Sequence, residues 1–503
     1  MGILDRVYKD SLSLLTDLYQ ITMAYAHWKT GSAGKEAVFH LFFRKNPFGS
    51  GFAIACGLEL AIEYIQNLRF PEEDLQYLAT LRGNDGAPLF EAGFLDYLRD
   101  LSFCCDVDAI PEGTVVFPNE PLLRARGPIV ACQLLETPLL NMMNFQTLVA
   151  TKAARIKLAA GEDHVSEFGL RRAQGIDGGL SASRAAYAGG CDSTSNLLAG
   201  KLFGIPVKGT HAHSWVLSFD SELEAFETYA EALPNNCVFL VDTYNTLEGV
   251  RHAVEVGRKL RLRGHQMVGI RLDSGDLAYL SREARKILDE GGFPEAAILA
   301  SNDLDENLIL SLKQEQGAQI TIWGVGTRLA VAHGDPALGG VYKLTAVREP
   351  GEDWEYRLKL SEQAVKTTNP GIQQVRRFTL NGEAIGDMIY DEPTGIPDEP
   401  IMVDPLDLTR RKTIPAGVEH TDLLVPVFRQ GSRVYEPPPL AEVRQRTQDQ
   451  LALFHGGVKR FVNPHQYPVG LELQYYDLKT RLILEARGLT PVTPVPLRRG
   501  EEG

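Results

Sequence analysis

The sequence predicts an α/β fold whose centre is an irregular or incomplete (β/α) barrel. Between about residues 164 and 328, apolar segments end in polar or glycine residues and then open a helical pattern. The segments are apolar without alternation, which indicates parallel strands buried on both faces. An open doubly wound sheet is the alternative, because closure of a sheet leaves no signal in a sequence. The expected strand ends recur at the near-regular spacing of repeated βα units, at Asp242, Asp273, Asp303 and Thr327.

Length and composition indicate a soluble protein of more than one domain. A chain of 503 residues is too long for one compact core, and its 44% hydrophobic and 23% charged residues are ordinary values. No stretch approaches the roughly 18 apolar residues of a membrane span, and the N-terminus lacks the apolar core of a secretory signal. The six cysteines form no CxxC pair, so we expect reduced thiols and a cytoplasmic protein.

The net charge of the chain indicates which kind of partner it can bind. The formal net charge is −14, whereas proteins that bind nucleic acid usually carry a basic field. We therefore expect no nucleic-acid partner. An anionic small substrate would require local arginine, lysine or backbone N–H groups.

The first third of the chain predicts helices around short strands. Residues 12–28 have helical spacing with Thr16 or Asp17 as the cap, and spacing alone makes Tyr19 a half-buried packing residue. The pair Arg44-Lys45 follows a strand and suits either solvent or an anion. The other expected elements are a strand at 38–43, helices at 56–68 and 71–101, short strands within 105–130 and a helix at 136–160.

The middle of the chain carries the βα pattern. The helix after Asp276 has an apolar stripe that includes Leu277 and Leu288, and Gly291 ends it. After residue 345 we expect a polar, proline-rich stretch at 349–420 with a hairpin at Asn381-Gly382, a helix at 440–453 and a frayed tail from Arg498. The expected strand segments are 164–172 with a helix at 179–188, then 205–219, 238–244, 267–276, 298–303 and 320–328.

Ligands of parallel α/β folds bind at the carboxyl ends of the strands. Arg271 and Asp273 lie two apart on one expected strand, so both side chains point the same way, as a ligand site or as a satisfied ion pair. The rule places these residues around one mouth: Phe168, Arg171, Thr210, His211, His213, Asp242, Arg271, Asp273, Asn302, Asp303, Gly326 and Thr327.

Two short motifs carry the candidate chemistry. The segment Gly324-Val-Gly-Thr-Arg328 lies between a strand and a helix, where free backbone N–H groups hold phosphate. His211 and His213 share one side of the chain if the extended conformation persists. Two such histidines can ligate the metal of a barrel hydrolase, but later strand ends offer no further histidine. The remaining interpretation is an imidazole base or nucleophile beside arginine and a phosphate site.

Six motifs taken together resemble the nicotinate phosphoribosyltransferase family from about residue 12 onward. The resemblance implies transfer of a 5-phosphoribosyl group from phosphoribosyl pyrophosphate to nicotinate, the first step of NAD salvage, with coupled ATP hydrolysis and Mg²⁺. It implies an enzyme of the ligase class with pentosyl transfer chemistry. The motifs are Thr16-Asp-Leu-Tyr-Gln20, Phe168-Gly-Leu-Arg171, Gly209-Thr-His-Ala-His-Ser214, Gly269-Ile-Arg-Leu-Asp-Ser-Gly-Asp-Leu277, Ala300-Ser-Asn-Asp303 and Gly339-Gly-Val-Tyr-Lys343.

The resemblance also implies roles for individual residues. His213 would be the histidine that ATP phosphorylates, and His211 lies where the family varies. Thr210 and Arg271 would bind the nicotinate carboxylate. Phe168 would stack on the pyridine, and Tyr19 would complete that stack from the neighbouring subunit of a head-to-tail homodimer. The remaining assignments are Gly326 and Thr327 on the 5′-phosphate, Asn302 on substrate, and Arg171, Asp242 and Asp273 around ribose, pyrophosphate and magnesium.

The family fold implies a barrel domain at 150–345 and a second α+β domain built from residues 1–149 and 346–503. Three rival functions remain: a nicotinamide phosphoribosyltransferase, a metal-dependent hydrolase that uses His211 and His213, and an inactive binding module. Gly209-Thr210 before Ala-His-Ser favours the acid over the amide.

Overall fold

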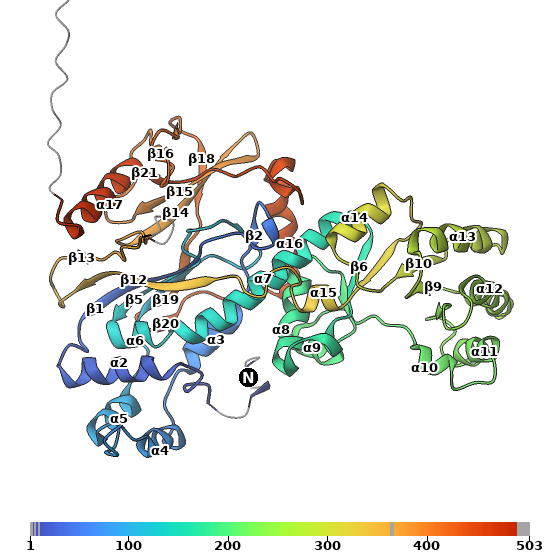
Figure 1. The fold of residues 1–503 in the computed structure, drawn as a ribbon, viewed down its shortest axis with the longest axis horizontal. Helices are drawn as coiled ribbons and strands as arrows, with labels where there is room; N and C mark the ends of the chain where they lie inside the picture. Colours follow the sequence, from blue (N-terminus) through green and yellow to red (C-terminus); the bar gives the residue numbers. More distant parts are fainter. Residues whose placement is uncertain (1–3, 5–6, 9–10, 363–366, 490–503) are drawn as a thin grey trace, which may run out of the picture.

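The structure is a computed structural model that describes residues 4, 7–8, 11–362 and 367–489. The predicted frayed tail from Arg498 lies outside these residues. Figure 1 shows a layered part that contains both ends of the described chain and a second part with the parallel strands. The long helix α7 (Glu136–Ala160) crosses from one part to the other. Most of its residues are buried, so it serves as a common core element for both.

The N-terminal helices start later and are shorter than the sequence predicts. The first predicted helix is confirmed only as α2 (Leu18–Lys29). Asp17 is its N-cap residue but makes no side-chain cap bond, because its Oδ2 accepts from Thr137 Oγ1 at 2.9 Å. The expected helix at 71–101 is two helices separated by a turn region. The elements here are α3 (Leu58–Asn67), α4 (Glu72–Thr80) and α5 (Ala92–Asp100).

A seven-stranded sheet combines strands from both ends of the chain. Its order is β13-β12-β1-β5-β3-β19-β20, so three early strands lie between strands that come after residue 340. β1 pairs antiparallel with β12, with His40 opposite Lys343. The strands are β1 (Glu36–Phe43), β3 (Asp106–Ala109), β5 (Leu123–Pro128), β12 (Gly340–Arg348), β13 (Glu355–Tyr356), β19 (Val425–Arg429) and β20 (Ser432–Arg433).

Smaller elements complete this part. The strands β2 and β4 pair with each other; β4 is one of the short strands expected within 105–130, whereas the sequence did not predict β2. The short helices η1 and α6 precede β2 and α7 respectively. Their bounds are Pro47–Gly49 for η1, Ala53–Ile54 for β2, Val115–Val116 for β4 and Ile129–Gln133 for α6.

The second part contains one six-stranded parallel sheet, which confirms the predicted repeat of βα units. Its order is β7-β6-β11-β10-β9-β8. No described strand pairs β8 with β7, so the expected closure into a barrel is not confirmed. The strands are β6 (His164–Glu167), β7 (Ser193–Thr194), β8 (Val238–Leu240), β9 (Gly269–Leu272), β10 (Ala297–Ala300) and β11 (Ile322–Val325).

Helices connect these strands. α13 begins after its N-cap Asp276 and ends at Gly291, as predicted, and α8 begins four residues before the expected Gly179. The helices are η2 (Leu170–Arg172), α8 (Gly175–Ala188), α9 (Leu197–Phe203), α10 (His213–Val216), α11 (Glu222–Ala232), α12 (Thr246–Leu262), α13 (Leu277–Glu290), α14 (Glu306–Gln314) and α15 (Thr327–Ala330).

The predicted strand at 205–219 is wrong. Within it only Val207 makes a strand-like bridge, to Thr194, and His213 already begins the short helix α10. Pro206 lacks an N–H group, and the Gly209–Ala212 stretch has no strand ladder, so extended pairing ends early. The two histidines therefore do not share a strand face.

The stretch at 349–420, which the sequence left unexplained, contributes to a third sheet of order β17-β16-β21-β15-β14-β18. The predicted hairpin joins β14 to β15, with Asn381 and Gly382 both at positive φ. The helix predicted at 440–453 is α16 (Leu440–Ala452). The other elements are β14 (Gln373–Leu380), β15 (Glu383–Asp391), β16 (Ile401–Val403), β17 (Arg411–Thr413), β18 (Glu419–Asp422), η4 (Gly456–Lys459), β21 (Val469–Glu472) and α17 (Leu473–Ala486).

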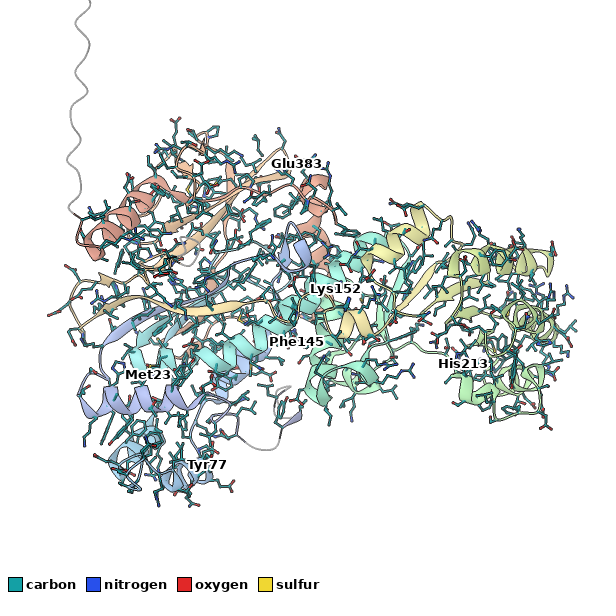
Figure 2. The ribbon with its side chains drawn as sticks, viewed as in Figure 1. Met23, Tyr77, Phe145, Lys152, His213 and Glu383 are labelled. Carbon is teal, nitrogen blue, oxygen red and sulfur yellow. The ribbon has the colours of Figure 1, made fainter. Side chains whose placement is uncertain are left out.

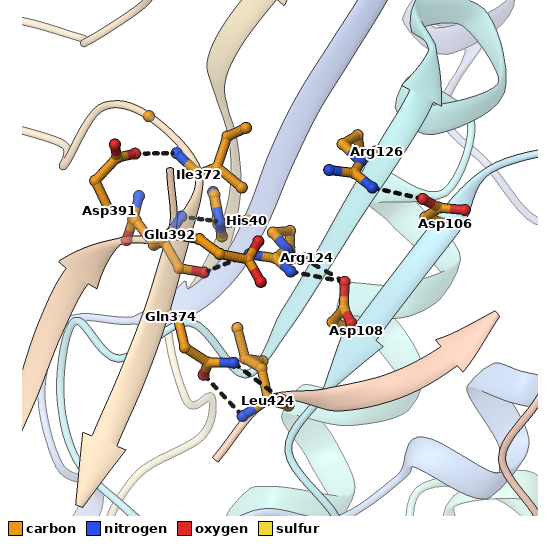
Figure 3. Close-up of polar contacts among 12 residues, drawn as sticks. His40, Asp106, Asp108, Arg124, Arg126, Ile372, Gln374, Asp391, Glu392 and Leu424 are labelled. Atoms are coloured by element: carbon orange, nitrogen blue, oxygen red, sulfur yellow. Dashed lines mark hydrogen bonds and ion pairs between the residues drawn. The ribbon is translucent and has the colours of Figure 1, made fainter. Parts of the chain in front are cut away.

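Polar contacts, centred on the buried side chains of Arg124 and His40, join the first sheet to the third (Figure 3). Arg124 of β5 lies between Asp108 and Glu392, at 2.9 Å and 2.8 Å from their carboxylate oxygens. His40 of β1 accepts the Gln373 N–H at Nε2, 3.2 Å away. Burial, and then the nearby guanidinium of Arg124, hold the pKa of His40 well below its ordinary value. A neutral histidine is therefore part of the connection between the two sheets.

No helix within the described residues is long and apolar enough to cross a membrane. The six cysteines are all free thiols, and only Cys104 is exposed.

Candidate active site

The candidate site lies at the carboxyl edge of the parallel sheet. β6, β8, β9, β10 and β11 run parallel, so the residues that follow them reach the same edge. The structure places a predicted residue after each of these strands: Phe168, Asp242, Asp273, Asn302 and Gly326.

Arg271 is the centre of the site. Its guanidinium donates from Nε to Ser301 Oγ at 2.9 Å, from Nη1 to Thr210 Oγ1 at 3.1 Å, and from Nη2 to Asp273 Oδ1 at 2.9 Å. Three N–H groups of the planar guanidinium are therefore held by three side chains, those of Ser301, Thr210 and Asp273. A guanidinium has five N–H groups, so one on Nη1 and one on Nη2 remain for a ligand.

An aromatic ring lies near this guanidinium. Phe168 follows β6, and its backbone N–H donates to Val325 O at 2.8 Å. The centre of its ring lies 5.9 Å from Cζ of Arg271. A Cβ atom on Gly324 would lie 2.8 Å from the Phe168 ring, so glycine is required there for the ring to lie over β11. The arrangement offers a flat apolar surface beside a charged fork.

Two carboxylates flank the guanidinium. Asp273 accepts from Arg271 and, in a very short contact, from the hydroxyl of Ser301. Burial raises the pKa of Asp273, but the bonds from Ser301 and Arg271 outweigh that effect, so the pKa lies below its ordinary value. Asp242 Oδ2 accepts from the Asp273 N–H at 2.8 Å and from Ser274 Oγ at 2.6 Å. Both groups are therefore held by neighbouring donors.

The second oxygen of Asp242 has no hydrogen-bond partner among the described residues. Its side chain is only 1% exposed, and Oδ1 faces His213 Nε2 at 3.9 Å. Asp273 Oδ2 lies 3.7 Å from the same nitrogen. A buried carboxylate oxygen without a donor is costly, so this position suits a cation or a protonated group.

His213 is partly open to solvent. It is the first residue of α10, and its side chain is 40% exposed. The ring nitrogen Nδ1 lies 3.1 Å from Thr243 Oγ1. An exposed imidazole whose orientation is fixed by a hydroxyl can serve as a base or a nucleophile.

His211 does not join His213. It is only 7% exposed, and its ring packs among Phe226, Tyr229 and Phe239. Burial lowers the pKa of His211 to about 4, and Nε2 accepts the Leu240 N–H at 3.2 Å. The alternative in which both histidines ligate one metal is therefore wrong, because one ring is committed to the core. No group of three or more His, Cys, Asp or Glu side chains within the described ranges is arranged to hold a metal ion.

The remaining predicted residues lie at the same edge with fewer contacts. Arg171 is exposed in η2, and no hydrogen bond or ion pair of its side chain occurs within residues 11–362 and 367–489. Asn302 is exposed with φ of +104°, a strained backbone of the kind found at ligand sites. Gly326 and Thr327 begin the single turn of α15 after β11. All four follow strands of the parallel sheet at its carboxyl edge.

Tyr19 is not among the described residues that contact this cluster. It lies on α2 with 47% of its surface exposed, so the side chain is about half-buried, as its spacing suggests. Met23, one turn further along α2, and His213 lie on opposite sides of the molecule in Figure 2. Tyr19 also lines a cavity of about 400 Å³ with residues of α7 and the loop before β12. No ring contact between Tyr19 and Phe168 of the same chain occurs within the described residues.

Sequence reasoning missed three hydroxyl groups. Ser301, Ser274 and Thr243 each bond a predicted site residue. Each directly follows a strand end or a predicted aspartate, which was the available signal. Hydroxyl residues are common at such positions, and the sequence does not show which of them turn inward.

A guanidinium, a hydroxyl and an aromatic ring thus surround one space, with two carboxylates and a histidine beside it. The class defined by this fold and site is an α/β protein whose candidate site, at the carboxyl edge of a parallel sheet, is built to accept a small anion.

Comparisons with known proteins agree with this class. The models of the nicotinate phosphoribosyltransferase (NAPRTase) N-terminal domain and C-terminal domain match residues 14–144 and 372–479. The nicotinate phosphoribosyltransferase of Bacillus subtilis (strain 168) is 45% identical, over 95% of this chain and 96% of that protein. The human nicotinate phosphoribosyltransferase is 37% identical, over 91% and 94% of the two chains.

Two solved structures share the fold of this chain. The crystal structure of human nicotinic acid phosphoribosyltransferase superposes with a TM-score of 0.81 at 34% identity, covering 93% of this chain and 99% of that one. The nicotinate-nucleotide pyrophosphorylase of Pyrococcus furiosus shares the fold, with a TM-score of 0.65 at 22% identity and coverage of 88% and 96%. The chain belongs to the nicotinate phosphoribosyltransferase family.

Proposed function

We propose that the protein is a nicotinate phosphoribosyltransferase, which forms nicotinate mononucleotide and pyrophosphate from nicotinate and phosphoribosyl pyrophosphate. This reaction is the first step of NAD salvage. The observation that carries the proposal is the guanidinium of Arg271, held by Thr210 and Asp273 beside the ring of Phe168. The names of relatives that align over more than nine-tenths of the chain support it.

Nicotinate fits the space in two ways. The two free N–H groups of Arg271 present a fork to a carboxylate, and charge-assisted bonds of this kind are stronger than neutral ones. The ring of Phe168 offers a face for stacking the pyridine. An amide would present one NH₂ group to a guanidinium that cannot accept a hydrogen bond, so the acid is the preferred substrate.

Phosphoribosyl pyrophosphate would extend from the pyridine along the edge of the sheet. Gly326 and Thr327 would take the 5′-phosphate with backbone N–H groups, and Asn302 and the free Arg171 would contact the remaining polar groups. Asp242 and Asp273 would face the ribose as positive charge develops on it during departure of pyrophosphate.

Magnesium is expected as the ion carried on pyrophosphate. The buried, partnerless Oδ1 of Asp242 and the adjacent Oδ2 of Asp273 fit a divalent cation by their chemistry. Bound there, Mg²⁺ would neutralise part of the charge on the leaving group. The two carboxylates would hold it together with oxygens of the substrate, which is consistent with a site of fewer than three protein ligands.

We further propose that ATP phosphorylates His213 and that hydrolysis of this phosphohistidine is coupled to the transfer. The exposed ring at the mouth of the site is accessible to a second substrate, whereas the buried His211 is not. The phosphoryl group would add about two negative charges beside the substrate site. The proposal places the protein in the ligase class.

The active unit is proposed to be a homodimer in which Tyr19 completes the site of the neighbouring subunit. Tyr19 makes no ring contact with Phe168 of its own chain within the described residues, and it lies in an exposed apolar group formed by Leu15, Leu18, Tyr19 and Met23. Leu18, Tyr19 and Met23 lie on α2 and Leu15 lies just before it, and grouped exposed apolar side chains are typical of a protein interface. The partner proposed to cover them is a second copy, whose site lacks this aromatic ring.

The structure also supports proposals about the closure of the barrel and the location of the protein. The Leu240 N–H bonded to His211 links β8 to the segment after β7, so we propose an irregular barrel whose seam is joined by a side chain rather than a strand ladder. The proposed domain boundaries remain 1–149, 150–345 and 346–503.

The six free cysteines support a cytoplasmic location.

The experiment that tests the function is incubation with labelled ATP, followed by mapping of acid-labile phosphate on the chain. Phosphate on His213 is the expected result. In parallel, turnover of nicotinate and nicotinamide with phosphoribosyl pyrophosphate should favour the acid. No product from either pyridine would overturn the transferase proposal, and phosphate at another residue would overturn only the role of His213.

A further inference from the structure

We infer that Asp305 and Arg328 are positioning residues for the phosphoribosyl end of the candidate site, because their ion pair ties together the two loops that form it. The inference deepens the proposed function and rests on it for the identity of the ligand. Arg328 Nη1 donates to Asp305 Oδ2 in a very short contact. The two residues follow neighbouring parallel strands, since Asp305 comes after β10 and Arg328 comes after β11.

The loop after β10 has a strained backbone that must be held at both ends. Asn302 and Asp303 both have positive φ, at +104° and +46°, although neither is glycine. Both side chains are exposed and make no hydrogen bond or ion pair within the described part of the chain. Backbone strain of this kind persists only where the surrounding structure enforces it. The strand β10 holds one end of the loop, and Asp305 holds the other.

Asp305 uses both oxygens of its carboxylate. Oδ1 caps α14 by accepting the N–H groups of Asn307 and Leu308 at 3.1 Å and 2.9 Å, and Oδ2 accepts from Arg328. The side chain is only 8% exposed. Burial raises the pKa of Asp305, but the bonds from Leu308 and Arg328 outweigh that effect, so the pKa lies below its ordinary value. One buried, charged carboxylate therefore joins the start of α14 to the loop after β11.

Arg328 connects this carboxylate to the turn that is proposed to hold the 5′-phosphate. It directly follows Gly326 and Thr327 and lies on the four-residue helix α15. The pair with Asp305 is the only hydrogen bond or ion pair that its side chain makes within the described residues. A single helical turn has little stability of its own, so contacts outside it decide its position. Arg328 would therefore act on the phosphate through the backbone of Gly326 and Thr327, and not through its own charge.

Asp305→Asn breaks the pair without removing the helix cap, because asparagine is an equally good N-cap residue. With its oxygen on the cap, the amide of this variant presents an NH₂ donor to a guanidinium that cannot accept a hydrogen bond. Arg328→Gln removes the charge from the other side, and Arg328→Lys retains it. Asp422→Asn is the matched control, because it breaks a part-buried pair with Arg376 on the third sheet.

The first measurement is hydrogen exchange of the ligand-free, full-length protein, followed by mass spectrometry for residues 301–306 and 326–332. The second is steady-state turnover, with the KM for phosphoribosyl pyrophosphate and the KM for nicotinate determined separately. We expect Asp305→Asn and Arg328→Gln to speed exchange of 326–332 and to raise the KM for phosphoribosyl pyrophosphate about tenfold, while the nicotinate KM changes by less than about twofold. Arg328→Lys should recover most of both effects, and Asp422→Asn should show neither.

A double variant with Asp305→Asn and Arg328→Gln separates positioning from direct binding. If the two residues act as one pair, the double variant is no worse than either single variant. An effect of Arg328→Gln that is much larger than that of Asp305→Asn, and that adds to it in the double variant, would overturn the inference in favour of direct phosphate binding by Arg328. Exchange and kinetics like those of the wild type in both single variants would also overturn it. Absence of turnover in the wild type would instead refute the proposed transferase, while the exchange measurement still decides the role of the pair.

Discussion

Thr210 Oγ1 and Arg271 Nη1 lie 3.1 Å apart, although their residues are 61 positions apart in the chain. The contact joins the segment before α10 to β9 across the carboxyl edge of the sheet. Two N–H groups of the Arg271 guanidinium stay without a partner among the described residues, and the Phe168 ring centre lies 5.9 Å from its Cζ. The first prediction concerns the two unbonded N–H groups of the Arg271 guanidinium.

Arg271→Ala should raise the nicotinate KM by roughly 10- to 150-fold. Loss of a hydrogen bond to a charged group costs about 1.5–3 kcal/mol, and each 1.4 kcal/mol is about tenfold. Steady-state kinetics at saturating phosphoribosyl pyrophosphate provide the measurement. Arg251→Ala, which removes an exposed pair with Glu248, is the control and should leave KM unchanged. An unaltered KM in Arg271→Ala would remove Arg271 from nicotinate binding.

His213→Ala should abolish the stimulation of turnover by ATP and leave slow, ATP-independent transfer. The reason is that the phosphoryl acceptor is lost while the Arg271 site stays intact. His252→Ala, which alters the histidine bonded to Glu222 on the outer helices, is the control. Initial rates with and without ATP give the result. Stimulation that persists in His213→Ala would contradict the phosphohistidine mechanism.

Gly324→Ala should impair nicotinate binding through Phe168. A methyl group there would meet the ring at 2.8 Å, so the ring must move from its place near Arg271. Gly209→Ala is the matched control, because a Cβ at that position meets no atom within 4 Å. We expect a raised nicotinate KM in the first variant only. Equal kinetics for both variants would mean that Phe168 does not stack on the substrate.

Mixed dimers should show whether Tyr19 serves the neighbouring subunit. Tyr19→Ala and Arg271→Ala would each impair every site of their own homodimer. In a heterodimer, one site combines an intact Arg271 with an intact Tyr19 from the other chain. Random exchange makes half of the dimers heterodimers with one intact site each, so about a quarter of wild-type activity should return. Activity that merely equals the average of the two variants would indicate that the sites are not shared.

Acid should destabilise the protein through its buried histidines. The pKa of His211 is lowered to about 4, and that of His40 lies well below its ordinary value, both first through burial. Unfolded histidines bind protons near pH 6.5, so the unfolded state gains protons first as pH falls. The free energy of unfolding should therefore fall between about pH 6.5 and 4, with His211 alone contributing about 2–3 kcal/mol.

Chemical denaturation at several pH values measures this slope. His211→Gln removes one titrating group and should flatten the pH dependence, although it lowers stability at neutral pH. A slope identical to that of the wild type would show that His211 does not titrate abnormally.

The parallel strands were predictable because each is a short apolar run that ends in polar residues, and the strands ending before Asp242, Asp273 and Asn302 are confirmed. The segment at 205–219 was not predictable by the same rule. It is apolar at its start, but Pro206 and the bonding of His211 to Leu240 decide its conformation, and that contact joins residues 29 positions apart. Local patterns carry no information about such pairings.

In the candidate site too, features set by the local sequence were predictable, and features set by distant contacts were not. Arg271, Asp273 and Thr210 were predicted to lie together, and the structure places them within hydrogen-bond distance. The opposite environments of His211 and His213 depend on the aromatic side chains of α11 and β8, which lie well beyond the local motif.

The sheet order β12-β1-β5-β3-β19 has a consequence for synthesis of the protein. Three strands made early must wait on the ribosome for partners that begin at Gly340 and Val425. During that interval both edges of the nascent sheet are unpaired, and unpaired edges attract other chains. Slow elongation or early release of the polypeptide should therefore produce aggregates rather than a shortened, partly active enzyme.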